Sequence, residues 1–186
     1  ALMVLWGVAG ATAGWVLEVN PFDQPNVQSA KDKTNEVLAS APPQIAAADD
    51  GALRALFEAG APSYLAIQAF CAPSAAVEAA AADLRALIRA RTGMATTFGY
   101  GPRYLHSTGQ LHKGGPPTGR FLQIVADSSP DIDAGQVGGQ AISFERLKHA
   151  QADGDLLVLR EHGLPAERIE SGADASAALN QLKDRF

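Results

Sequence analysis

Apolar and polar positions follow two different periods along the middle of the chain. Residues 49–61 and 73–93 carry apolar side chains at helical spacing; the first has a capping aspartate, and in the second Ser74 is the predicted N-cap and Gly93 follows the end. Three shorter runs are continuously apolar or β-rich, and we predict them as strands: 63–70, 94–101 and 120–127. Because strands and helices alternate, the order predicts a mainly parallel sheet with right-handed crossovers, and hence a three-layer α/β sandwich.

The last third of the chain continues this pattern less regularly. We predict, in order, a flexible loop, a helix, a short strand and a terminal helix: 127–139, 143–163, 165–171 and 174–186. The longer helix begins at Ser143, is interrupted by Gly154, and is expected to carry Glu145 and Arg146 outward and His149 on its surface. The terminal helix is expected to pack through three apolar side chains: Leu179, Leu182 and Phe186.

The first 17 residues are almost wholly apolar, and small residues at 9–12 suit close packing against other helices. Their length is near the lower limit for a membrane span. No basic residue precedes them and Glu18 follows directly, so a signal peptide fits poorly. The chain also lacks an initiator methionine. We therefore predict a buried helix from a longer parent chain, with Trp6 and Trp15 in a core; a membrane span is the alternative.

A segment rich in alanine and proline, "SAPPQIAAADD" at 40–50, separates this N-terminal part from the α/β pattern. Such a composition is typical of a linker. We therefore predict three parts: an N-terminal piece at 1–40, a linker at 41–50 and an α/β domain at 51–186.

Composition narrows the class of protein. With 186 residues, of which 47% are hydrophobic and 19% charged, the chain is long and apolar enough for a packed core. The net charge of −5 provides no basic field, so nucleic acid and anionic membranes are not expected partners. The only cysteine, Cys71, follows an apolar run and is expected to be a buried thiol; a single cysteine fits a reducing, cytoplasmic setting.

Candidate chemistry begins in "NPFDQPNVQSAKDK", residues 20–33. A helix that starts near Pro25 places Gln24 at its N-terminal end, where free backbone N–H groups favour an anion. Lys31 lies about 9 Å further along the helix axis and could hold, or protonate, an oxygen of an anionic ligand. The alternative is a loop-to-helix entry with a solvated lysine.

The same run resembles the C-terminal signature of phosphoglucose isomerases, in which an aromatic residue, Asp and Gln precede a valine, an acidic residue and then the catalytic lysine. The resemblance implies that Lys31 assists opening of the hexose ring and contacts substrate oxygens, and that Gln24 contacts the substrate. Two positions differ from the family pattern: Pro25-Asn26 replaces a bulky residue and glycine, and Gln28 replaces the usual glutamate.

A second candidate segment, residues 98–124, lies between two predicted strands and is rich in glycine. Loops at the carboxyl ends of parallel strands bind ligands in open α/β sheets. Arg103 and Lys113 supply cations suited to phosphate. The other candidate substrate contacts are polar side chains of the same loop: His106, Ser107, Thr108 and His112. The two histidines are six residues apart, so one helical face would not present both to a metal ion, and no metal site is predicted. A purely structural, bracing loop is the alternative.

"GPRYLHSTGQLHKGG" in this segment resembles the C-terminal extension of bifunctional transaldolase/phosphoglucose isomerase proteins, and the resemblance covers essentially all 186 residues in order. It implies interconversion of glucose 6-phosphate and fructose 6-phosphate through a cis-enediol, with no metal or organic cofactor. It further implies that the catalytic glutamate and the rest of the sugar isomerase (SIS-type) domain, preceded by a transaldolase barrel, belong to a missing N-terminal part of the parent. A second copy of the chain, as in a homodimer, is a candidate partner.

A function of another class fits the same residues. The segment could be a non-catalytic α/β module that forms a dimer or docks enzyme domains, with the histidine-containing loop bracing an interface. The differences at Pro25, Asn26 and Gln28 favour this alternative. A sugar-phosphate sensor that binds without turnover is a third possibility.

Overall fold

A four-stranded parallel sheet forms the centre of the protein. The computed structural model describes residues 1–128, 130–137 and 140–185. The strand order is β2-β1-β3-β6, and all three pairings are parallel. In that order the strands are Ala95–Tyr100, Tyr64–Phe70, Gly119–Val125 and Ala166–Glu170. The strands predicted at 63–70, 94–101, 120–127 and 165–171 are therefore confirmed.

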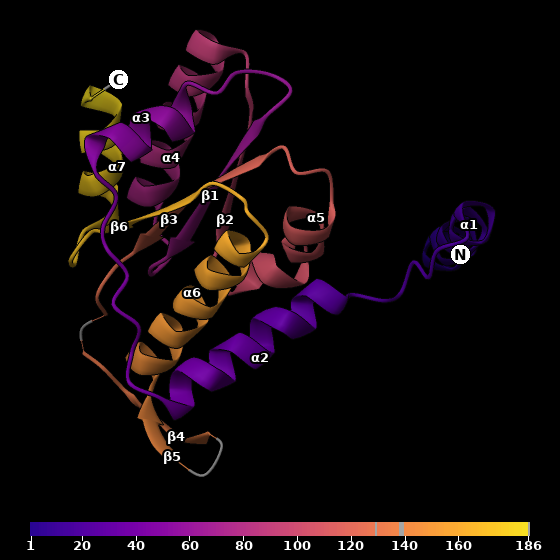
Figure 1. Cartoon of the computed structure of the whole chain (residues 1–186), viewed down its shortest axis with the longest axis horizontal. Coiled ribbons are helices and arrows are strands. Elements are labelled where there is room, and N and C mark those ends of the chain that lie inside the picture. The colour runs from indigo at the N-terminus through magenta and orange to yellow at the C-terminus, as the bar shows by residue number, and fades with distance from the viewer. Residues whose placement is uncertain (129, 138–139, 186) are drawn as a thin grey trace.

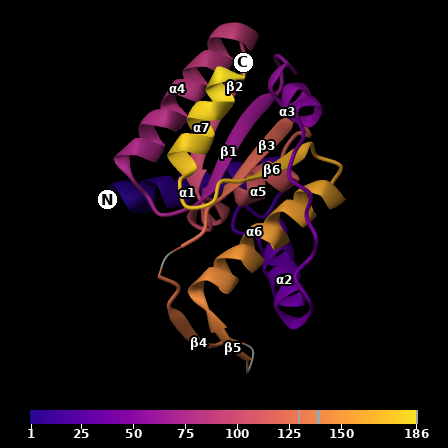
Figure 2. The same ribbon diagram turned by 90° about the vertical axis from the view of Figure 1, so that its left-hand side faces the viewer.

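Helices cover both faces of this sheet, which makes the fold a three-layer α/β sandwich, as predicted (Figure 1). One face is covered by α3 (Asp50–Phe57), α4 (Ala75–Thr92) and α7 (Ala175–Asp184); Figure 2 shows α4 and α7 side by side on it. The opposite face is covered by α5 (Gly109–Gly114) and α6 (Phe144–Glu161), together with the short 3-10 helix η1 (Arg103–His106), and α2 (Pro25–Ala39) packs against α5 and α6.

Side chains alternate between these two layers along each strand. Leu65 and Ile67 of β1 enter the larger apolar core with α3, α4 and α7, whereas Ala66 packs with Phe121 and Leu156 on the α6 side. The helix ends also follow the sequence signals. Ser74 accepts a hydrogen bond from the backbone N–H of Val77, and Gly93 ends α4 in the left-handed conformation that favours glycine.

Gly154 does not interrupt α6, contrary to the prediction, because this glycine serves close packing between two helices. A Cβ atom at Gly154 would lie 2.7 Å from Thr34 Oγ1 and 2.9 Å from Thr34 N on α2. The missing side chain therefore lets α2 lie directly against α6. Helix α2 thus packs against the layer that covers the sheet, and residues 40–49, which form neither helix nor strand, connect it to α3. The division into domains at 41–50 stays a prediction.

The structure corrects two further expectations and tests a third only in part. The loop predicted at 127–139 contains β4 (Asp133–Val137), which pairs antiparallel with β5 (Gln140–Ser143); residues 138–139 lie outside the described residues. Glu145 and Arg146 are half-buried and hydrogen-bonded rather than directed outward. Helix α7 packs through buried Leu179 and Leu182, whereas Phe186 lies outside the described residues.

The apolar N-terminal segment forms α1 (Leu2–Leu17), but its predicted burial is wrong for this chain. Trp6 is 74% exposed and Trp15 is 81% exposed. Figure 1 shows α1 lying away from the sheet, joined to α2 by an extended segment. Apolar side chains surround the whole helix, so burying them would require packing beyond the contacts of the described residues. No helix among the described residues is both long enough and apolar enough to cross a bilayer.

We predict that Gly154→Ala destabilises the protein by about 1–3 kcal/mol, because the added methyl group would force α2 away from α6. Alanine has the higher intrinsic helix propensity, so a stabilised variant would contradict this interpretation. The matched control is Gly7→Ala in α1, where a Cβ would meet nothing within 4 Å, and it should not lower stability. Urea unfolding of the three proteins measures the difference.

Candidate functional site

The two candidate segments of the sequence lie side by side. The chain leaves β2 through η1 and α5, which fold back over the face of the sheet and reach the N-terminal end of α2 (Figure 1). The backbone N–H of Asn26 donates a hydrogen bond to Gln110 Oε1 at 3.0 Å. Val27 faces Gly109 across the same contact. The 98–119 loop therefore touches the helix that carries Lys31.

Beneath this loop, polar residues form a row across the sheet. Gly99, Gln68, Gln123 and Arg168 are paired in register on the four successive strands. The three side chains are buried, with Gln68 only 1% exposed. Arg168 Nε donates to Gln123 Oε1 at 2.8 Å, and Gln123 Nε2 donates to the carbonyl of Ala152 at 2.9 Å. The row links the sheet to α6 by hydrogen bonds rather than by apolar contact alone.

Lys113 belongs to a buried ion pair in this structure. Its ammonium group donates to Asp155 of α6, and both side chains are fully buried. Tyr104 of η1 donates to the other carboxylate oxygen of Asp155, and burial followed by the Asp155 charge raises the pKa of Tyr104 well above its usual value. Lys113, one of the two cations predicted to bind phosphate, thus already has an anionic partner.

His112 is buried next to this pair and is held neutral. Burial lowers its pKa to about 4, with Lys113 acting in the same direction and Asp155 opposing. Its Nδ1 lies 3.5 Å from Gln68 Nε2, while aromatic rings of Tyr64, Tyr104 and Phe121 surround it. Gln68 Oε1 has no hydrogen-bond partner among the described residues. A buried acceptor and a neutral imidazole therefore lie side by side.

These groups border a pocket of about 390 Å³ between β1, β2 and the folded-back loop. Four predicted residues line it: Arg103, Ser107, Thr108 and His112. The Arg103 guanidinium lies 5.7 Å from the centre of the Tyr100 ring. The hydroxyl groups of Ser107 and Thr108 both donate to the carbonyl of Tyr104 at 3.2 Å. The arrangement offers one exposed cation, hydroxyl groups and a neutral imidazole to a small polar ligand.

The remaining predicted residues lie outside this pocket lining. Lys31 and Gln24 are exposed on and just before α2, and His106 is exposed at the end of η1. Within 1–128, 130–137 and 140–185, the side chains of Lys31 and Gln24 form no hydrogen bond or ion pair. Both are therefore available to a ligand or to another surface.

Sequence reasoning missed several residues that organise the site: Gln68, Tyr104, Gln123, Asp155 and Arg168. A signal for two of them exists, because "YLAIQAF" and "RFLQIVAD" each place one glutamine inside a run predicted as a buried strand. A buried polar side chain needs a partner, so each glutamine marks a position where polar groups must meet. The aspartate carries no comparable signal, since its lysine partner is 42 residues away in sequence.

The strand order, the parallel pairing and the helices on both faces define the chain as a three-layer α/β protein. Among solved structures, the hypothetical protein TT0462 from Thermus thermophilus is similar, with a TM-score of 0.57 and 15% sequence identity. The match covers 88% of this chain and 43% of that protein, so this chain spans less than half of the neighbour's length. At this identity the likeness shows the fold alone. No protein-family model and no curated protein sequence matches the chain.

We predict that Lys113→Ala lowers the free energy of unfolding by about 3–5 kcal/mol, because it leaves the Asp155 carboxylate buried without its cation. The control is Lys183→Ala, which removes an exposed ion pair of 3.0 Å with Asp83 and should change stability by less than about 1 kcal/mol. Denaturant unfolding at pH 7 compares the two variants. If both substitutions lower the free energy of unfolding by the same small amount, the Lys113–Asp155 pair does not stabilise the fold in the way proposed.

We predict that His112 makes stability depend on pH between about 4 and 6.5. Its pKa is lower in the folded than in the unfolded state, so the unfolded chain binds the proton first and stability falls as pH decreases through this window. The loss amounts to about 3 kcal/mol at pH 4 relative to pH 7. Urea unfolding as a function of pH should show a shallower dependence in His112→Gln, while His106→Gln, at an exposed histidine, keeps the original slope. Parallel curves for His112→Gln and the unmodified protein would contradict the burial of a neutral imidazole.

Proposed function

We propose that this chain is part of a cytoplasmic glucose-6-phosphate isomerase, which interconverts glucose 6-phosphate and fructose 6-phosphate. Lys31 assists ring opening and contacts substrate oxygens, and Gln24 is a substrate contact. The base that moves the proton between C2 and C1 is a glutamate outside this chain, in the N-terminal part of the parent. The reaction needs no metal or organic cofactor.

The observation that carries this proposal is the contact between the two segments with the isomerase-like sequences. The Asn26–Gln110 hydrogen bond joins the start of α2 to α5, so the helix bearing Lys31 lies against the loop bearing Arg103. A ligand that carries both a phosphate and a chain of hydroxyl groups needs cations and hydroxyl partners in one neighbourhood. Exposed Lys31 and Arg103, with Ser107 and Thr108, supply such groups on adjoining elements.

The bound sugar phosphate has a defined place in this proposal. The Arg103 guanidinium pairs with phosphate oxygens, and the hydroxyl groups of Ser107 and Thr108 turn from the Tyr104 carbonyl to the ligand. Lys31 then interacts with the ring oxygen or O1 from the neighbouring helix and stabilises the charge that develops on the oxygens of the cis-enediol. Lys113 supports the loop from beneath rather than touching the substrate, because it is buried and paired with Asp155, whereas the neutral His112 imidazole lines the pocket.

A second candidate function is a non-catalytic module for dimerisation or domain docking. Two observations favour it. Lys113 is already paired with Asp155, so one of the predicted phosphate-binding cations is used inside the fold. Helix α1 also exposes apolar side chains all round, as expected of an element that packs against another protein surface.

Thermal unfolding with and without millimolar 6-phosphogluconate separates the two functions. At about 100 times its dissociation constant the ligand should stabilise the protein by about 2.7 kcal/mol, which is a shift of a few degrees. Lys31→Ala and Arg103→Ala should each reduce the shift. Lys183→Ala is the matched control, since it removes a lysine charge on α7, and it should leave the shift unchanged.

Either of two results contradicts the isomerase proposal. One is a ligand shift that is the same in Lys31→Ala as in the unmodified protein. The other is the absence of a shift both in this chain and in a longer parent that includes the rest of the isomerase domain, which favours the docking module. In that parent, Lys31→Ala should lower the rate constant kcat strongly while it leaves the free energy of unfolding nearly unchanged.

A further inference from the structure

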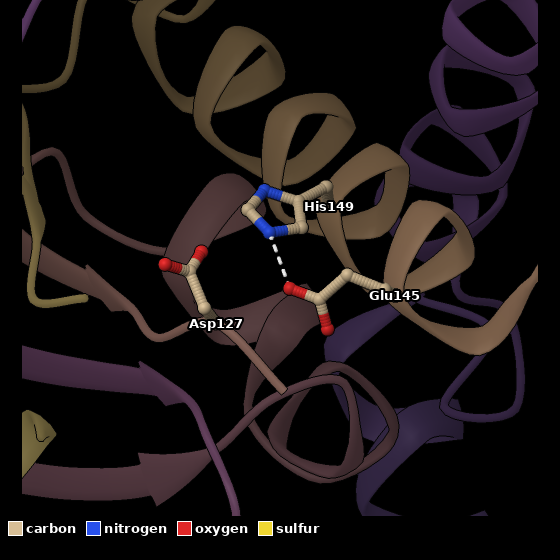
Figure 3. Close-up of side chains that lie close together, drawn as sticks. All are labelled: Asp127, Glu145 and His149. Atoms are coloured by element: carbon tan, nitrogen blue, oxygen red, sulfur yellow. Dashed lines mark hydrogen bonds and ion pairs between the residues drawn. The ribbon is translucent and has the colours of Figure 1, made fainter. Parts of the chain in front are cut away.

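Three potential metal ligands come together at a place that no sequence motif indicated. Asp127 follows β3 by two residues, and Glu145 and His149 lie one turn apart on α6 (Figure 3). One ligand atom from each side chain lies within 4.8 Å of the other two. Common sequence signals for metal sites, such as paired histidines at helical spacing, do not join a strand end to a distant helix, so the fold alone reveals this cluster.

The topology of the sheet makes this a favoured place for a ligand. After β1 the chain crosses through α4 to β2, and after β3 it crosses through α6 to β6 on the other side. Because neighbouring strands β1 and β3 send their connections in opposite directions, their carboxyl ends form the switch point of the sheet. Asp127 lies at this point, where its backbone N–H is anchored to the carbonyl of Gly172 at 2.9 Å.

The Glu145 carboxylate is oriented from both sides. Its Oε1 is 2.8 Å from His149 Nε2, and its Oε2 accepts from Lys148 Nζ at 2.8 Å (Figure 3 draws the first contact). Lys148 also donates to Ser128 Oγ at 2.9 Å and to the carbonyl of Ala126, so it ties α6 to the end of β3. A cation can replace the contact between Oε1 and the imidazole while Lys148 keeps Oε2 in place.

The charges around the cluster favour a further cation. Asp131 Oδ1 accepts from the backbone N–H of Glu145 at 3.0 Å, which adds a third carboxylate beside Asp127 and Glu145. Around the cluster and the cavity next to it, three cations, Lys148, Arg146 and Arg168, stand against five carboxylates, which are these three together with Asp153 and Glu170. A divalent ion therefore meets a net attractive field even with the ammonium group in place.

A cavity of about 450 Å³ borders two of the three side chains, Glu145 and His149. Arg168, only 3% exposed, also lines it, and its NH2 nitrogen has no hydrogen-bond partner among the described residues. An unpaired buried donor is costly, so this cavity is expected to hold an acceptor such as a water molecule or an anion. The cavity thus gives an ion both a route from solvent and space for a non-protein ligand.

We propose that Asp127, Glu145 and His149 bind one divalent transition-metal ion of the Zn²⁺ class through two carboxylate oxygens and one imidazole nitrogen. This ligand set, with three protein groups, leaves at least one coordination position for water or an anion from the cavity. Ligand atoms around a tetrahedral Zn²⁺ are about 3.3–3.5 Å apart, so the 2.8 Å contact between Glu145 Oε1 and His149 Nε2 must open by about 0.5 Å, while exposed Asp127, whose ligand atom lies within 4.8 Å of the other two, rotates toward them. The site is separate from Lys31 and Arg103 and does not depend on the isomerase proposal.

The test is metal titration of the chelator-treated protein, prepared without a polyhistidine tag. Isothermal titration with Zn²⁺ should show one site per chain, and Co²⁺ should produce visible absorption typical of nitrogen and oxygen coordination. Asp127→Asn and His149→Gln should each weaken Zn²⁺ binding at least about tenfold. Both positions are partly or fully exposed, so far-UV circular dichroism should show an intact fold in each variant.

The matched control is His162→Gln, which removes an exposed histidine at the far end of the same helix and should leave the affinity unchanged. Two results would overturn the proposal. The first is no Zn²⁺ or Co²⁺ binding by the folded protein. The second is binding that survives in both Asp127→Asn and His149→Gln, or that is lost equally in His162→Gln.

Discussion

Two buried carboxylates on α6 are the constraint on which the rest of this face depends. Asp153 and Asp155 both point into the protein, and a buried charge is tolerated only when it is paired. Arg168 of β6 pairs with Asp153 at 2.6 Å, and Lys113 of α5 pairs with Asp155. These two pairs fix α6 against the far edge of the sheet and fix α5 against α6. Loss of either partner would leave an ion in a region with little water.

The ion pair between Lys113 and Asp155, with the hydrogen bond from Tyr104, also explains the properties of the pocket next to it. Burial keeps the His112 imidazole neutral by lowering its pKa; of the ion pair beside it, the Asp155 charge opposes this effect and the Lys113 charge supports it. Tyr104, held by the same carboxylate, anchors η1 over β2 and so forms one wall of the pocket. Four of the loop residues predicted as ligand contacts show two different roles. Arg103, Ser107 and Thr108 line the pocket from its accessible side, whereas Lys113 maintains the shape that makes the pocket possible.

Much of the fold could be predicted because its signals are local. Ser74 and Gly93 mark the ends of α4 by their own hydrogen bonds and conformation, and each strand of the sheet is a short apolar run. The site was less predictable because its contacts join distant residues: Tyr104 and Asp155 are 51 residues apart. Gly154 illustrates the difference. Its intrinsic propensity suggested a break, but the close approach of Thr34 of α2, which no local pattern shows, decides its role.

The contacts among the described residues do not explain the stability of helix α1. An isolated helix of 16 residues is only marginally stable in water, and α1 has no polar face to present to solvent. Only Gly14 is buried, against the side chain of Pro21, so the contact that orients α1 is made with its own connecting segment. Its stability must therefore come from packing against a surface that the described residues do not supply. Both proposed functions include such a surface, either the remaining part of an isomerase domain or a second protein module. Because α1 leads directly into the segment carrying Gln24 and Lys31, covering it would also restrict the position of the residues proposed to meet the substrate.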